Sequence, residues 1–262
     1  MKVLVLTSSR FGIASRCLPA LSQSPQIEVI GVVLAGAARR NLKKQVARKL
    51  RKTLKIGLLG ALNGLRLRRW YADQETEDLR DCAKRFAVPW FQVPGLNSEE
   101  TIATFRRLSP DLGISLNNSY IAAKVFTIPR FGMINVHGEV LPRFPGAQSV
   151  LWAIYEGCRE CGFTIHQVEQ RIDKGEILLV RSFPLTLKPA LRETVRHNLA
   201  KLNQEIPLAL CRVCEDYSEL RRHAQAQGAQ RSYTTPSFRQ FLSMGRNHRQ
   251  MYREAVAAGQ ID

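Results

Sequence analysis

The opening strand–helix–strand pattern constrains the fold more than any other feature of the chain. Residues 2–7 carry Val and Leu in quick succession, and this apolar run predicts a buried central strand. A polar loop then leads into a predicted helix that ends near residue 25, and residues 27–33 predict a second strand. The pattern is typical of a dinucleotide-binding unit, but the sequence has neither a G-x-G-x-x-G nor a P-loop motif. Open α/β sheets of this kind bind ligands at the carboxyl ends of their strands.

The second informative stretch is residues 134–146, a buried-strand pattern that runs into a Pro- and Gly-rich loop. Asn135 and His137 alternate with apolar residues, so both polar side chains should project from the same face of this strand. Asp173 follows 36 residues after His137, in a turn before another apolar run. An amide, an imidazole and a carboxylate are the groups that acyl transfer to an amine requires. The alternative is structural: Asn135 and His137 would make their hydrogen bonds inside the core at the end of the strand, and Asp173 would only form a turn.

Four segments agree, in order and spacing, with one known family: INVHGEVLPRFPG at 134–146, WAI at 152–154, GFTI at 162–165 and IDKGEIL at 172–178. They resemble the catalytic domain of the 10-formyltetrahydrofolate-dependent formyltransferases. That family includes glycinamide ribonucleotide, methionyl-tRNA and amino-sugar N-formyltransferases. The resemblance covers roughly residues 1–185 and is strongest between 134 and 178.

The resemblance implies an α/β fold, with a Rossmann-like, mostly parallel sheet and helices on both faces. The catalytic domain would occupy residues 1–185, with a basic amphipathic insertion at 37–71. Residues 186–262 would form a small, mainly helical C-terminal extension. Apolar residues at 3–4 spacing from Leu191 to Val213 support a long helix there, with a kink at Pro207.

The resemblance also implies a reaction, the direct transfer of formyl from 10-formyltetrahydrofolate to a primary amine. His137 would accept the proton of the amine, as a base that is neutral near pH 7. Asn135 would donate a hydrogen bond to the oxyanion, and Asp173 would hold a water and favour the imidazolium after transfer. We expect no metal, because the two CxxC pairs, at 158–161 and 211–214, lie too far apart for a compact zinc module.

The same resemblance assigns binding residues on each side of the reacting groups. On the donor side it implies Leu116, Asn117, Asn118, Gly146, Ile172 and Gly175. On the acceptor side we expect Ser8, Ser9, Arg10, Glu139 and Arg143. Two residues depart from the family pattern, namely Glu139 in place of a small residue and Pro145 in place of an Arg. The Glu139 carboxylate either binds the substrate ammonium or faces solvent.

A strongly basic segment accounts for most of the net charge of +17. Residues 39–69 contain twelve Lys or Arg and no Asp or Glu, and a leucine or valine recurs every four residues from Leu42 to Leu62. Such a segment is typical of a membrane-surface or nucleic-acid-binding helix. Three interpretations stay open: a solvated helix with its Leu stripe buried, an anionic membrane surface, or RNA or another partner.

The function that these observations favour is formylation of an amino sugar, most simply one linked to a nucleotide. Residues 231–238 resemble the segment that closes several amino-sugar formyltransferases. The residues after 185 are too few and too helical for the tRNA-binding barrel of the methionyl-tRNA enzymes, so nucleic acid is the less favoured partner. The alternatives are an enzyme for a lipid-linked or membrane-proximal amine, and a non-catalytic RNA- or membrane-binding protein on this scaffold. We expect a cytoplasmic protein, with peripheral membrane attachment and a homodimer left open.

Overall fold

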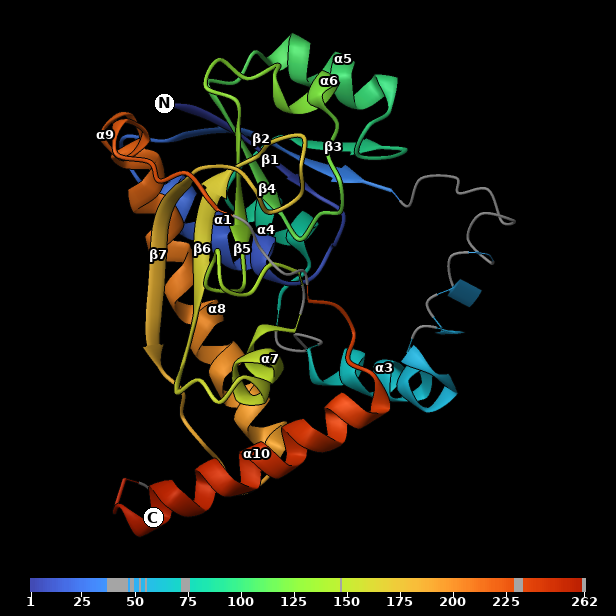
Figure 1. Ribbon diagram of the computed structural model, residues 1–262. Coiled ribbons are helices and arrows are strands. Elements are labelled where there is room, and N and C mark those ends of the chain that lie inside the picture. The colour runs from blue at the N-terminus through green and yellow to red at the C-terminus, as the bar shows by residue number, and fades with distance from the viewer. Residues whose placement is uncertain are drawn as a thin grey trace.

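The computed structural model describes residues 1–36, 56–71, 76–146, 148–228 and 233–260, together with residues 47, 50, 51, 53 and 54. Much of the predicted basic segment, including Leu42 and Val46, therefore lies outside the described residues. Figure 1 shows one sheet running through the centre of the molecule, with helices packed around it.

The sheet has seven strands in the order β3-β2-β1-β4-β5-β6-β7. The strands are β1 (Lys2–Thr7), β2 (Glu28–Ala35), β3 (Trp90–Val93), β4 (Leu112–Leu116), β5 (Met133–His137), β6 (Glu160–Gln167) and β7 (Ile177–Pro184). The first five pair in parallel, and β6 and β7 extend the sheet antiparallel. The predicted mostly parallel sheet is confirmed.

Helices join and cover the strands. They are α1 (Ile13–Gln23), α3 (Leu58–Trp70), α4 (Leu79–Arg85), α5 (Glu99–Leu108), α6 (Ala123–Phe126), α7 (Ser149–Tyr155), α8 (Leu191–Glu215), α9 (Tyr217–Arg222) and α10 (Phe238–Ala257). The Ser98 side chain caps α5 by accepting from the backbone N–H of Thr101, and Ser237 and Gln240 form a capping box on α10.

Helices lie on both faces of the sheet, as predicted. Side chains alternate along β1, so Val3 and Val5 enter one hydrophobic cluster while Leu4 and Leu6 enter another. The first cluster is covered by α1, α4 and α8, and the second by α5 and α6. Because every residue of β4 is buried, its run of apolar residues is what a central strand between two helical layers requires.

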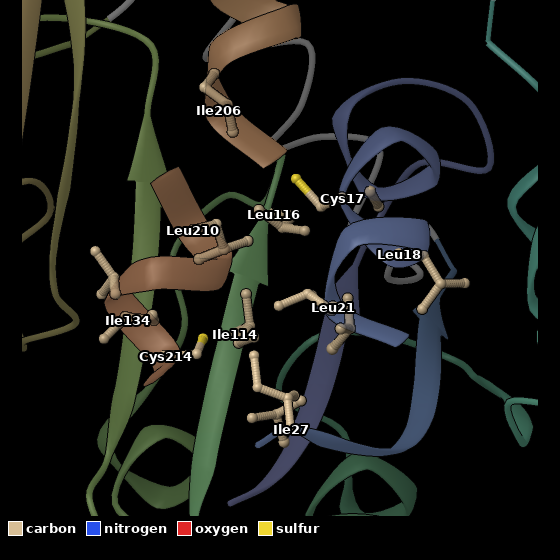
Figure 2. Packing of buried hydrophobic residues seen from close by; sticks show 14 of the residues in the cluster. Cys17, Leu18, Leu21, Ile27, Ile114, Leu116, Ile134, Ile206, Leu210 and Cys214 are labelled. Atoms are coloured by element: carbon tan, nitrogen blue, oxygen red, sulfur yellow. The ribbon is translucent and has the colours of Figure 1, made fainter. Parts of the chain in front are cut away.

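The long helix predicted after residue 191 is α8, which includes Pro207. Its residues Ile206, Leu210 and Cys214 pack against α1 and the strands β4 and β5 in one cluster, as Figure 2 shows. The C-terminal region is mainly helical, as expected, and its longest helix shares a core with the sheet. The division at residue 185 stays a prediction.

A third cluster lies below the sheet in Figure 1, where α3, α7 and α10 meet. The ring centroids of Trp70 and Phe241 are 5.9 Å apart, and the Trp152 indole N–H donates to the Thr234 carbonyl at 3.0 Å. The segment that precedes α10 also pairs with the loop after β5, because the Tyr233 N–H donates to the Pro145 carbonyl at 2.8 Å. The C-terminal segment thereby contacts both α7 and the loop after β5.

The basic segment differs from its simplest interpretation. We considered a helix with its leucine stripe buried, but Leu50, Leu54, Leu58 and Leu62 are all exposed. The face of α3 that packs inward is formed instead by Gly60, Asn63, Leu67 and Trp70. The buried-stripe interpretation is therefore wrong for these leucines, and Trp70 is a core residue. Among the described residues, none of the helices has the length and apolar character to cross a membrane.

Replacing Leu210 by Ala should destabilise the protein by about 2–5 kcal/mol, because it leaves a cavity where α8 packs on the sheet. The matched control is Leu208→Ala, two residues away on the exposed side of the same helix, which should cost about 0.5 kcal/mol or less. Urea unfolding measures both. Equal losses in the two variants would show that α8 does not share the core of the sheet.

Candidate active site

A cavity of about 530 Å³ lies beyond the carboxyl ends of β4 and β5. This volume is within the range of pockets that hold small organic ligands. β5 delivers Asn135 and His137 to the cavity, and the turn between β6 and β7 delivers Asp173. The three residues singled out in the sequence therefore line one site.

The amide of Asn135 is held in a fixed orientation by its neighbours on both sides. β4 and β5 pair in parallel with Ser115 opposite Asn135, and the Ser115 hydroxyl donates to Asn135 Oδ1 at 3.0 Å. β5 and β6 pair antiparallel with His166 opposite Asn135, and Asn135 Nδ2 lies 3.2 Å from His166 Nε2. An amide has two N–H donors. One reaches His166, and the second is suited to donate to an oxyanion in the cavity.

His166 is neutral in this position. Burial lowers its pKa to about 4, and the nearby His137 acts in the same direction. Its Nδ1 donates to the Gln167 carbonyl at 2.7 Å, so that Nε2 carries the lone pair and accepts from Asn135. His166 thus fixes which way the Asn135 amide points.

His137 lies between two carboxylates. Its Nε2 is 2.5 Å from Glu139 Oε2, and its Nδ1 is 3.4 Å from Asp173 Oδ1. Only 7% of His137 and 5% of Glu139 is exposed, so bulk water screens this contact weakly. The Phe144 carbonyl is a further acceptor, 3.3 Å from Nε2.

The two carboxylates decide the charge of His137. Burial by itself lowers the His137 pKa, but the Glu139 and Asp173 carboxylates outweigh it and raise the pKa to about 9. The ring is therefore an imidazolium at neutral pH. The sequence-based expectation of a neutral imidazole near pH 7 does not hold for this environment.

Glu139 does not face solvent, which was one of its two predicted placements. It is buried, lines the cavity and contacts His137. Burial raises the pKa of the Tyr71 phenol, and the Glu139 carboxylate raises it further. The second predicted role, binding a substrate ammonium, stays a prediction and is compatible with this position.

The structure brings some of the predicted donor-side residues to the cavity and leaves others out. Asn117, Asn118, Gly146 and Ile172 line it. Leu116 is fully buried in β4, and Gly175 packs so closely on β6 that a Cβ would lie 1.8 Å from the Gln167 carbonyl oxygen. These last two residues support the site without lining it.

Four of the predicted acceptor-side residues lie outside this cavity. The Ser8 hydroxyl donates to the Asn117 carbonyl at 2.8 Å, and the Ser9 hydroxyl donates to the Phe11 carbonyl. Arg10 forms an ion pair with Asp78, which caps α4. Arg143 is exposed, with its guanidinium 5.4 Å from the centre of the Phe144 ring. In this arrangement Ser8 and Arg10 connect the loop after β1 to other segments of the chain.

Sequence reasoning missed several residues of the site, among them Ser115, His166, Tyr71 and Arg171. His166 was within reach, because it is a polar residue in a strand predicted to be buried, seven residues before Asp173. Tyr71 carries no such signal. It reaches the cavity only because α3 packs against the loops beside β5.

The fold and the cavity together define an α/β protein with a ligand-sized cavity at the carboxyl ends of a mostly parallel sheet. The model of the formyl transferase family matches residues 1–210. The chain therefore belongs to the formyl transferase family. Members of this family transfer formyl groups, and they take them from 10-formyltetrahydrofolate.

Similar curated sequences include methionyl-tRNA formyltransferases. The protein from Anaeromyxobacter sp. (strain K) is 34% identical over 134 residues, which is 51% of this chain and 43% of that protein. The protein from Pseudoalteromonas translucida is 31% identical over 113 residues, 43% of this chain and 35% of that protein. The matches thus span less than half the length of these relatives.

Solved structures with the same fold come from enzymes with different acceptors. Phosphoribosylglycinamide formyltransferase from Anaplasma phagocytophilum aligns with a TM-score of 0.58 at 18% identity, over 89% of this chain and 98% of that one. A sugar N-formyltransferase from Shewanella sp. FDAARGOS_354 has a TM-score of 0.55 at 13% identity, over 94% and 87% of the two chains. An N-formyltransferase from Helicobacter canadensis, solved with folinic acid and dTDP-3-aminofucose, has a TM-score of 0.53 at 13% identity, over 89% and 71%.

The contact between Glu139 and His137 predicts how the imidazole titrates. Glu139→Gln keeps the size of the side chain but removes a negative charge, so the His137 pKa should fall from about 9 towards the ordinary value of about 6.5. Because the folded-state pKa is the raised one, the stability that the pair contributes is present below about pH 6.5 and is lost as the pH rises through 9. NMR titration of the ring measures the pKa.

Glu169→Gln is the control for that titration. Glu169 lines the same cavity, and in the described part of the chain it forms no ion pair with His137. Its loss should leave the titration nearly unchanged. An unaltered His137 titration in Glu139→Gln would show that the carboxylate does not hold the charge of the ring.

Proposed function

We propose that this chain is an N-formyltransferase that transfers formyl from 10-formyltetrahydrofolate to a primary amine. The observation that carries the proposal is the meeting of Asn135, His137 and Asp173 in one cavity of a chain that belongs to the formyl transferase family. The complete set of reacting groups disfavours the non-catalytic alternative. A protein that only binds RNA or membrane does not need the Asn135 amide to be hydrogen-bonded on both sides, or the buried ion pair of His137 and Glu139 beside it.

The cavity suits the pterin of a folate. Two of its lining residues, Asn118 and Gln148, carry buried amide oxygens that have no hydrogen-bond partner among the described residues. A buried acceptor without a partner is unfavourable, and the N–H groups of a pterin would satisfy both oxygens. The donor supplies the formyl carbon that the amine attacks. The bond from that carbon to N10 then breaks, and N10 of the departing tetrahydrofolate takes up the second proton that the amine loses. Asn117, Gly146 and Ile172 would complete its surroundings.

The charges around His137 suit an acceptor that arrives as an ammonium ion. With both carboxylates ionised, Glu139 and Asp173 contribute two negative charges against the single positive charge of His137, and His166 is neutral. The cluster therefore has a net charge of −1. We infer that Glu139 accepts the proton that the ammonium must lose before it can attack.

The same cluster stabilises the transition state. Negative charge develops on the formyl oxygen, and the second N–H of Asn135 is oriented to bind it. The His137 imidazolium lowers the electrostatic cost of that charge in a cavity where screening is weak. Asp173 holds the ring from its other nitrogen and keeps it charged. His166 keeps the amide in place.

The acceptor that we propose is an amino sugar linked to a nucleotide. Arg171 lines the cavity and supplies a positive charge for a phosphate group. The sugar N-formyltransferases among the structural neighbours, one solved with a dTDP-linked amino sugar, support this choice. One observation favours a lipid-linked amine instead, namely the exposed leucines of α3, which lead directly to Tyr71 in the cavity.

Asn135→Ala should lower kcat by about 10²–10³, because it removes the donor to the oxyanion. Binding of the stable donor mimic 5-formyltetrahydrofolate should be retained, which shows that the cavity is intact. Two measurements are needed: the rate of amine formylation gives kcat, and the thermal shift with 5-formyltetrahydrofolate reports binding of the donor mimic. A variant with full activity would remove this amide from the mechanism.

Thermal unfolding with 5-formyltetrahydrofolate tests the donor site itself. A ligand at a hundred times its Kd should add about 2.7 kcal/mol to the stability of the folded protein. Repeating the measurement with a panel of nucleotide-linked amino sugars identifies the acceptor, and the matching sugars without the amine are the controls. No shift at millimolar folate would overturn the assignment of the donor.

A further inference from the structure

The exposed face of α3 is unusually rich in leucine for a helix face that contacts water. Leu58, Leu59, Leu62 and Leu65 of α3, and Leu50 and Leu54 before it, are each between 55% and 76% exposed. Leu58, Leu62 and Leu65 recur at intervals of four and three residues, so within α3 they share one face. Contiguous apolar patches of this kind mark interaction surfaces.

The opposite face of α3 is fixed to the protein. Gly60, Asn63, Leu67 and Trp70 are buried there. A Cβ on Gly60 would lie 3.3 Å from the Phe238 backbone nitrogen, so α3 packs closely on the start of α10, as Figure 1 also shows. This buried face holds the helix in place, while Leu58, Leu62 and Leu65 point away from the core.

Positive charge accompanies the exposed leucines. Arg51, Arg66, Arg68 and Arg69 are exposed, and the sequence between residues 39 and 69 contains no acidic residue. The Arg66 guanidinium lies 5.2 Å from the centre of the Trp70 ring, which holds it beside the leucine face. Apolar side chains flanked by arginines complement an anionic lipid surface, where leucines enter the acyl boundary and arginines meet headgroups.

We propose that α3 and the leucines that precede it form a docking surface for anionic membranes. A second copy of the chain fits less well, because a two-fold contact through this face would bring like charges together. An RNA partner would use the arginines but leave the leucines in water. A bilayer with anionic lipids would contact both the leucines and the arginines.

Docking has a consequence for the catalytic cavity. Tyr71 follows α3 directly and lines that cavity. A membrane bound through α3 would therefore lie on the side of the molecule from which Tyr71 enters the site. The docking surface itself stands whatever amine is formylated, because it rests on exposed side chains outside the cavity.

Co-sedimentation with vesicles tests the proposal with the whole chain. We expect binding to vesicles of one part phosphatidylglycerol to three parts phosphatidylcholine, weaker binding at high salt, and little binding to phosphatidylcholine alone. The double variant Leu58→Gln and Leu62→Gln should weaken binding by about tenfold or more. Arg68→Gln with Arg69→Gln should weaken it by about fivefold per charge removed.

Matched controls lie on other helices. Leu208→Gln with Val256→Gln changes two exposed apolar residues of α8 and α10, and Arg192→Gln with Arg196→Gln removes two exposed charges from α8. Both pairs should bind vesicles as the parent does. All variants should keep the thermal shift with 5-formyltetrahydrofolate, which shows that they are folded.

Three results would overturn the proposal. One is no binding to anionic vesicles, and another is equal binding by the α3 variants and their controls. The third is a dimer, seen by sedimentation velocity without lipid, that the leucine variants dissociate while vesicle binding is unchanged.

Discussion

The register of β5 between its two neighbours is the constraint on which the site depends. Parallel pairing with β4 sets Ser115 opposite Asn135, and antiparallel pairing with β6 sets His166 opposite the same residue. Side chains alternate along a strand, so a slip of one residue in either pairing would turn the Asn135 amide to the other face. The antiparallel pairing of β6 with β7 places the turn between them beside the end of β5, and this turn carries Asp173 to the imidazole.

A buried imidazole between two carboxylates is costly to build. Each charge loses its hydration, and only close contact between opposite charges offsets that loss. Here Glu139 and Asp173 reach the two ring nitrogens from different segments, the loop after β5 and the turn after β6. Tyr233 pairs with the loop at Pro145 and Gly146, where a Cβ would collide with its carbonyl, and so fixes the first loop from outside.

The sequence predicts the parts of the site that depend on local pattern. Strand alternation placed Asn135 and His137 on one face, and the turn before β7 marked Asp173. The charge state of His137 could not be predicted in this way, because it depends on the distance between its ring and Glu139, which local pattern does not determine. Arg10 and Arg143 were expected on the acceptor side, Arg10 because it follows the first strand at its carboxyl end. The structure gives them other partners, Asp78 and the Phe144 ring.

The helix α3 shows a second limit of prediction from sequence, namely which face of an amphipathic helix is buried. A leucine at every fourth position establishes that the leucines share a helical face, but the pattern does not say whether that face is inside or outside. Packing decides that, and here the face of Gly60, Asn63, Leu67 and Trp70 is buried, with Gly60 close to the start of α10. Burying the leucines instead would have exposed Trp70 and placed Arg66 and Arg69, which follow them along the same face, against the core. The arginines therefore keep the leucine face outside, and the same arginines make that face suitable for an anionic surface.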